Sequence, residues 1–84
     1  MNLTFAPQAW EDYLYWQRTD PKVVSRIHDL IKDILRSSFD GIGKPEPLKH
    51  ALQGYWSRRI NGEHRIVYKI VEGVVLILQV RYHY

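Results

Sequence analysis

The chain contains no cysteine among its 84 residues, which excludes disulfides and any zinc site built on thiolates. Its apolar runs are short, and none approaches the roughly 18 residues that a membrane-spanning helix requires. The first residues lack the basic start and the apolar stretch of a secretory signal peptide. Together these absences predict one small domain, residues 1–84, located in the cytoplasm and without membrane contact.

Acidic residues are scarce in the second half of the chain. The formal net charge is only +3, but residues 44–69 contain six lysines and arginines and just two acids, Glu46 and Glu63. Such a local positive charge suits an anionic ligand. The four histidines show no paired ligand spacing, so the sequence offers no support for a metal site, and no other cofactor is expected.

Apolar periodicity in the first half predicts a short strand at residues 2–5 followed by two helices. Pro7 and Pro21 each fit the first turn of a helix, and Asp20 is a suitable N-cap for the second helix. The expected buried stripe of that helix consists of Val24, Ile27, Ile31, Ile34 and Leu35. Because the connection is so short, the two helices should form an antiparallel hairpin.

Residues 37–54 interrupt the periodicity and form the longest irregular segment. It is punctuated by Gly41, Gly43, Pro45 and Pro47. Prolines on both sides restrict the backbone around Glu46, so this carboxylate should lie on a stiff part of the loop. Residues 48–52 are compatible with a single helical turn. Long loops in compact domains are often functional.

Three strands are expected in the second half, at residues 55–60, 63–71 and 74–82. The turns between them are predicted at Asn61-Gly62, a strong signal for a two-residue hairpin loop, and at Glu72-Gly73. The resulting order is β-α-α-β-β-β. It indicates an α+β fold with the helix hairpin packed on one face of a twisted antiparallel sheet.

The alternation of side chains along each strand separates two faces of the predicted sheet. The more apolar face should meet the helices and holds Trp56, Arg58, Ile60, His64, Ile66, Tyr68, Ile70, Leu78, Val80 and Tyr82. The open face holds Ser57, Arg59, Arg65, Val67, Lys69, Gln79, Arg81 and His83. This places His64 in a structural role, whereas Arg58 is left between a contact with the helices and one with a partner. A cationic face of this kind is either merely solvated or an anion-binding site.

The chain ends in Arg81-Tyr82-His83-Tyr84 directly after an apolar strand pattern. A cation, an imidazole and two aromatic rings at a strand end can bind phosphate, donate a proton and stack on bases. With the Glu46 carboxylate, they suit the cleavage of RNA, whose own 2′-hydroxyl is the nucleophile. Such a reaction needs a base, an acid and cations, but no metal.

Several segments carry a resemblance to a known family. They are residues 10–17 (WEDYLYWQ), 43–50 (GKPEPLKH), 56–60 (WSRRI), 63–68 (EHRIVY) and 81–84 (RYHY). In this order they resemble the YoeB toxins of the RelE/ParE superfamily over the whole chain. The resemblance implies a microbial RNase-like fold and an endoribonuclease, or mRNA interferase, that cuts mRNA in the A site of the 30S ribosomal subunit. It also implies a YefM-type antitoxin as partner and favours a homodimer.

The resemblance assigns roles to individual residues. Glu46 would be the general base, His83 the general acid, Arg65 the group that stabilises charge on the phosphate, and Tyr84 the residue that orients a base. Lys44, Lys49 and Arg59 would supply further RNA contacts. A different class remains open: a non-catalytic toxin of the same superfamily that binds another target, such as gyrase. An acidic antitoxin segment would cover the basic face in either case.

Overall fold

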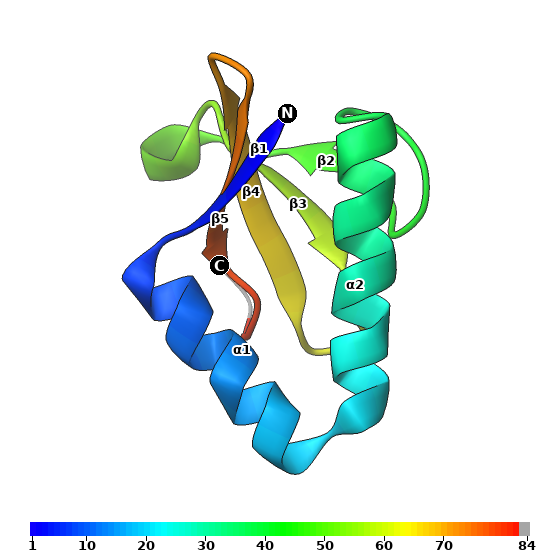
Figure 1. Ribbon diagram of the computed structural model, residues 1–84. Helices are drawn as coiled ribbons and strands as arrows, with labels where there is room; N and C mark the ends of the chain where they lie inside the picture. Colours follow the sequence, from blue (N-terminus) through cyan, green and yellow to red (C-terminus); the bar gives the residue numbers. More distant parts are fainter. Residues whose placement is uncertain (83–84) are drawn as a thin grey trace.

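The computed structural model describes residues 1–82, and its element order agrees with the prediction apart from one added strand (Figure 1). The elements are β1 (Asn2–Phe5), α1 (Pro7–Thr19), α2 (Pro21–Arg36), β2 (Glu46–Pro47), the 3-10 turn η1 (His50–Leu52), β3 (Trp56–Arg59), β4 (Arg65–Val71) and β5 (Val74–Gln79). The predicted α+β class and helical turn are therefore confirmed. The addition is β2, a two-residue strand too short to be recognised from sequence.

The five strands form one sheet in the order β1-β5-β4-β3-β2. All neighbours are antiparallel except β1, which pairs in parallel with β5 from Asn2↔Val74 to Phe5↔Ile77. The sheet is therefore mixed, where a fully antiparallel one was predicted. The helix pair carries the chain from β1 at one edge of the sheet to β2 at the other.

Each helix begins at the predicted proline, Pro7 for α1 and Pro21 for α2. Asp20 is the only residue between α1 and α2, and its Oδ1 accepts hydrogen bonds from the backbone N–H groups of Lys22 and Val23, at 3.1 and 3.4 Å. The helices diverge from this point as a V (Figure 1). In the described residues 1–82, neither is long and apolar enough to cross a membrane.

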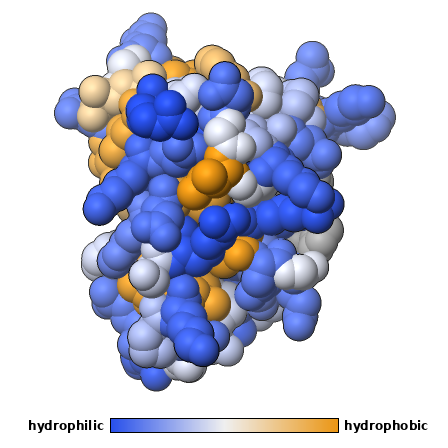
Figure 2. Space-filling model, turned by 90° about the vertical axis from the view of Figure 1, so that its right-hand side faces the viewer, coloured by the Kyte–Doolittle hydropathy of each residue, from blue (hydrophilic) through white to orange (hydrophobic). Residues whose placement is uncertain are grey.

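The core lies between the helices and one face of the sheet. Its buried residues are Ala9, Trp16, Val23, Ile27, Leu30, Ile31, Ile34, Ile60, Ile66, Tyr68, Val75, Ile77 and Val80. The predicted stripe of α2 needs correction at its margins, since Val23 and Leu30 are buried while Leu35 is 39% exposed. Val24 packs only partly against the core. The face of α2 turned to solvent is mostly hydrophilic (Figure 2).

A β-bulge shifts the side-chain alternation of β5. Val67 pairs with Gln79 and Tyr68 with Ile77, which leaves Leu78 as an extra residue on β5. Val75, Ile77 and Val80 therefore all belong to the core, and Leu78 does not. The prediction that Leu78 faces the helices was wrong because strict alternation holds only while the ladder is unbroken.

The loop between β3 and β4 is wider than the predicted two-residue turn. It spans the five residues between Arg59 and Arg65, and the Ile60 N–H donates to the His64 carbonyl at 3.0 Å. The Asn61 side chain accepts from the N–H groups of Glu63 and His64, both at 2.9 Å. Asparagine thus stabilises this loop through its side chain, as in an Asx turn.

Candidate functional site

The face of the sheet opposite the helices brings Glu46 into line with the central strands. Glu46 of β2 pairs with Ser57 of β3, which pairs with Val67 of β4. Directly opposed residues project from the same face of a sheet. Ser57 and Val67 are fully buried, while Glu46 at the edge is exposed. The carboxylate of Glu46 therefore lies at the exposed edge of this face, beside the buried residues Ser57 and Val67.

Two arginines lie one step further along the same face. Arg59 and Arg65 are directly opposite each other on β3 and β4, two residues beyond Ser57 and Val67. Arg59 is exposed and Arg65 half-buried. Like charges opposed on a ladder are unfavourable. The pair therefore presents two positive charges on one face, as an anionic ligand requires.

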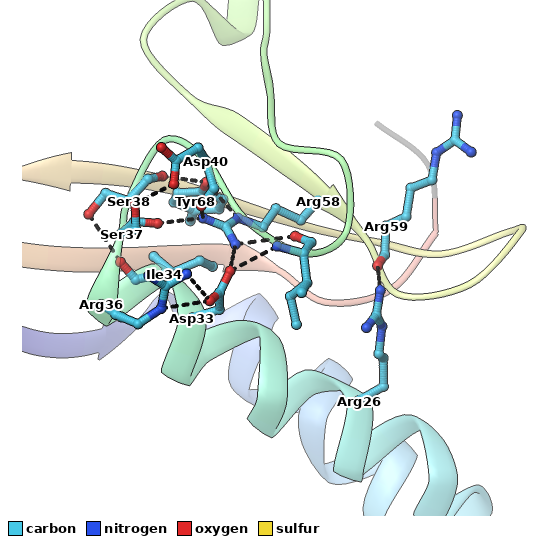
Figure 3. Close-up of polar contacts among 11 residues, drawn as sticks. Arg26, Asp33, Ile34, Arg36, Ser37, Ser38, Asp40, Arg58, Arg59 and Tyr68 are labelled. Carbon is cyan, nitrogen blue, oxygen red and sulfur yellow. Dashed lines mark hydrogen bonds and ion pairs between the residues drawn. The ribbon is translucent and has the colours of Figure 1, made fainter.

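The loop before β2 is hydrogen-bonded to β3 at Arg59. The Arg59 N–H donates to the Gly43 carbonyl at 2.6 Å, and Lys44, the next residue, is exposed with φ of +53°. Gly43 has φ of +81°, and a side chain there would collide with Leu30. Figure 3 shows the Arg59 guanidinium pointing away from α2, while Arg26 of that helix binds the Arg59 carbonyl at 3.3 Å.

A pocket of about 550 Å³ adjoins Glu46. It is lined by Glu46, Pro47, Leu48, Lys49, His50 and Leu52. The predicted base and the predicted RNA-binding Lys49 therefore share one hollow. His50 is exposed, has φ of +58° and received no role from the sequence. The one sequence signal that could have singled out His50 is its place in the segment GKPEPLKH, next to Lys49 and close to Glu46.

Arg58, whose role the sequence left open, is a buried structural residue (Figure 3). One guanidinium nitrogen donates to Asp33 of α2 at 2.6 Å and to the Ile42 carbonyl at 3.2 Å. The other donates to the carbonyls of Ser37 and Asp40, at 2.7 and 2.9 Å. Its Nε donates to the Tyr68 hydroxyl at 3.1 Å. Arg58 thus holds the loop that leads to Lys44 and Glu46 against the helix side of the sheet.

This arrangement shifts the pKa values of Asp33 and Tyr68, and the hydrogen bond to Asp33 also raises the pKa of Arg36. Hydrogen bonds from Arg36, from the Ile42 N–H and from Arg58 lower the pKa of Asp33 to about 2. Burial raises the pKa of Tyr68, although Arg58 acts in the opposite direction. The Tyr68 phenol therefore stays protonated and donates to the Ser38 carbonyl at 2.7 Å.

Replacing Asp33 with asparagine should make unfolding less sensitive to acid. The folded pKa of Asp33 is about 2, below the ordinary 3.8, so its ionisation contributes stability above about pH 4 that is lost as pH falls toward 2. The gap in urea midpoint between the wild type and Asp33→Asn should therefore narrow from about pH 5 to about pH 2.5. A gap that stays constant would show that ionisation of Asp33 does not contribute.

The C-terminal segment departs from the predicted faces. Arg81 was expected on the open face, but its guanidinium carbon lies 3.5 Å from the centre of the Tyr15 ring of α1. Tyr82 was expected toward the helices, but it is 56% exposed. Both errors arise because β5 ends at Gln79, beyond which strand alternation no longer applies. His83 and Tyr84, the predicted acid and base-orienting residue, lie outside the described residues.

The structural role predicted for His64 is confirmed. Its ring meets Trp16 of α1 edge-on, with 4.8 Å between ring centres. Its Nδ1 accepts a hydrogen bond from the Tyr82 N–H at 2.8 Å. Within residues 1–82, no group of three or more histidines and acids is placed to hold a metal ion.

Comparison with known proteins gives a consistent picture. Residues 5–84 match the model of a family described as YoeB-like toxins of bacterial type II toxin–antitoxin systems. The chain is 55% identical to toxin YoeB of Escherichia coli K12 over 84 residues, which is the full length of both. A YoeB/ParE toxin from Agrobacterium tumefaciens has 48% identity and a TM-score of 0.98, with both chains fully covered.

Two solved structures from Staphylococcus aureus are also similar, each with 52% identity and covering all of this chain and 98% of theirs. One is a YoeB dimer, with a TM-score of 0.93. The other is a heterotetrameric YoeB–YefM toxin–antitoxin complex, with a TM-score of 0.92.

Proposed function

The chain belongs to the YoeB family of toxins of bacterial type II toxin–antitoxin systems, and we propose that it is a ribosome-dependent endoribonuclease. Its substrate would be mRNA in the A site of the 30S subunit, and its effect the inhibition of translation. One observation carries the proposal: the carboxylate of Glu46 and the opposed arginines Arg59 and Arg65 project from one face of the sheet.

Glu46 is the proposed general base. It would take the proton of the ribose 2′-hydroxyl, whose oxygen attacks the adjacent phosphorus and forms a cyclic phosphate. Glu46 suits this task because it is exposed, lines a pocket and is held in register with Ser57 by the short strand β2. A positioned acid or base contributes about 10²–10⁴ to such a rate.

The cations would stabilise the negative charge that develops on the phosphate. Arg65 is the proposed principal contact, because it is half-buried next to exposed Arg59, and a charge in a drier place acts more strongly. Lys44 and Lys49 would bind flanking phosphates. His83 is proposed to protonate the 5′-oxygen as it leaves, and Tyr84 to orient a base. These two assignments rest on the family resemblance.

The proposed partners are an antitoxin and a second copy of the chain. A YoeB of S. aureus forms a complex with YefM, so we propose a YefM-type antitoxin for this chain. An acidic segment would be attracted to the basic face and would mask Arg59 and Arg65. The dimeric S. aureus YoeB supports a homodimer here as well. The proposed place of action is the cytoplasm, where the ribosomes are.

The mechanism makes cleavage depend on a single oxygen of the substrate. Primer extension on a defined mRNA should show a cut at the A-site codon when programmed ribosomes are present and none without them. Replacing the nucleotide 5′ of the cut with its 2′-deoxy form should abolish the product, because the nucleophile is absent. Retained cleavage would contradict the 2′-hydroxyl mechanism.

The same assay separates the enzyme from a toxin that only binds. If folded, RNA-free protein produced no cut on ribosome-bound mRNA, the binding toxin would be the better explanation. Arg59 and Arg65 would then be docking charges, and Glu46 would have no catalytic part.

A further inference from the structure

The chain is held unusually firmly after its last strand. Chain ends are usually poorly ordered unless other elements fasten them. Here the Val80 N–H donates to Asp12 at 3.2 Å, and the Val80 carbonyl accepts from the indole N–H of Trp16 at 2.8 Å. The Tyr82 N–H donates to His64 at 2.8 Å, and the Tyr82 carbonyl accepts from the Arg65 N–H at 3.1 Å. All four backbone groups therefore have partners.

Helix α1 supplies the inner half of this attachment. Asp12 and Trp16 are 3% and 7% exposed, so their hydrogen bonds to Val80 lie in the protein interior. Between these contacts and Tyr82, the Arg81 guanidinium covers the Tyr15 ring. These side chains fix the segment against the helix.

The attachment of Tyr82 depends on one imidazole nitrogen, Nδ1 of His64. A backbone N–H can only donate, so Nδ1 of His64 must be unprotonated to accept from Tyr82. Tyr82 has φ of +64°, a conformation that is uncommon for residues other than glycine and persists where the surroundings enforce it. His64 and the Arg65 N–H are the two groups that meet its backbone. Both the N–H and the carbonyl of Tyr82 are therefore hydrogen-bonded, the first to His64 and the second to Arg65.

We propose that His64 is a positioning residue for the reaction: it fixes the backbone at Tyr82 and so sets the point from which the next residue, His83, acts. This inference rests on the proposed endoribonuclease function and assigns His64 no contact with RNA. Orientation is the reason that the contact matters, because misplacing a reacting group by about 1 Å can cost about 10²-fold in rate.

Two substitutions separate the hydrogen bond from the packing. His64→Asn places an amide oxygen where Nδ1 stands, two bonds from Cβ, and therefore keeps an acceptor for Tyr82. His64→Leu fills similar space without an acceptor. Both lose the aromatic contact with Trp16, so the difference between them reports the hydrogen bond alone. The two readouts are the exchange rate of the Tyr82 amide by NMR and single-turnover cleavage of ribosome-bound mRNA.

The expected result is slow Tyr82 exchange in the wild type and His64→Asn, and fast exchange in His64→Leu. The cleavage rate at saturation should fall about 10²-fold in His64→Leu and be largely restored in His64→Asn, with unchanged affinity for ribosomes. Equal exchange in the two variants, or equal cleavage rates, would overturn the inference. No cleavage by the folded wild type would instead overturn the proposed function, and this inference with it.

Discussion

Arg58→Met is expected to lower the free energy of unfolding by about 3–5 kcal/mol, because several acceptors lose their donor and each buried one left unsatisfied costs about 1–3 kcal/mol. The substitution keeps an unbranched side chain of similar length but removes every donor. Asp33 loses its buried partner, and the carbonyls of Ser37, Asp40 and Ile42 lose theirs. The whole free energy of unfolding of a native protein is only about 5–15 kcal/mol. Urea unfolding followed by far-UV circular dichroism measures the loss.

The next residue provides a matched control. Arg59→Met changes the same chemical group, but on an exposed side chain, so its free energy of unfolding should stay within about 0.5 kcal/mol of the wild type. The stable Arg59 variant should nevertheless cleave RNA more slowly than the wild type, since it loses a proposed phosphate contact. If the two variants unfolded at the same urea concentration, the network around Arg58 would not support the loop as described.

Glu46→Gln is expected to lower the single-turnover cleavage rate by about 10²–10⁴, the range for loss of a positioned general base. The amide is nearly the same size as the carboxylate but cannot take the proton of the 2′-hydroxyl. Stability should hardly change, because Glu46 is an exposed residue on an edge strand of two residues. The measurement is primer extension under saturating ribosomes, with the thermal midpoint recorded for the same preparation.

Glu72→Gln is the control for the change in charge. It removes one negative charge from an exposed residue in the turn between β4 and β5, at a distance along the sheet from the β2 edge. Its cleavage rate should equal that of the wild type. If Glu46→Gln were as active as Glu72→Gln, Glu46 would not be the base, and His50 of the same pocket would become the next residue to test.

Local signals in the sequence were sufficient for most of the fold. Pro7, Pro21 and Asp20 define both helix starts because proline and a capping carboxylate act within a few residues. The open face of the hairpin was also predictable, since Arg59 and Arg65 follow strict alternation and end up opposite each other. For Glu46 the sequence predicted only a stiff part of the loop, and the pocket that it shares with Lys49 is a finding of the structure.

Other features depend on contacts between distant residues. The bulge at Leu78 and the parallel pairing of β1 with β5 are properties of the sheet that no single strand encodes. The sequence left Arg58 between a contact with the helices and one with a partner, and only the meeting of α2, the loop and β4 shows it to be buried. Similarly, parity could not reveal that Arg81 packs on Tyr15, because the strand has ended there.

The parallel pairing of β1 with β5 also bears on the synthesis of the protein. β5 lies between β1 and β4, so the last strand made is an inner strand of the sheet. Asn2 pairs with Val74, and the segment that follows β5 is held by Asp12 and Trp16 near the start of the chain. Contacts this distant form late in folding. A nascent chain therefore completes the sheet only after β5 and the segment that follows it have left the ribosome.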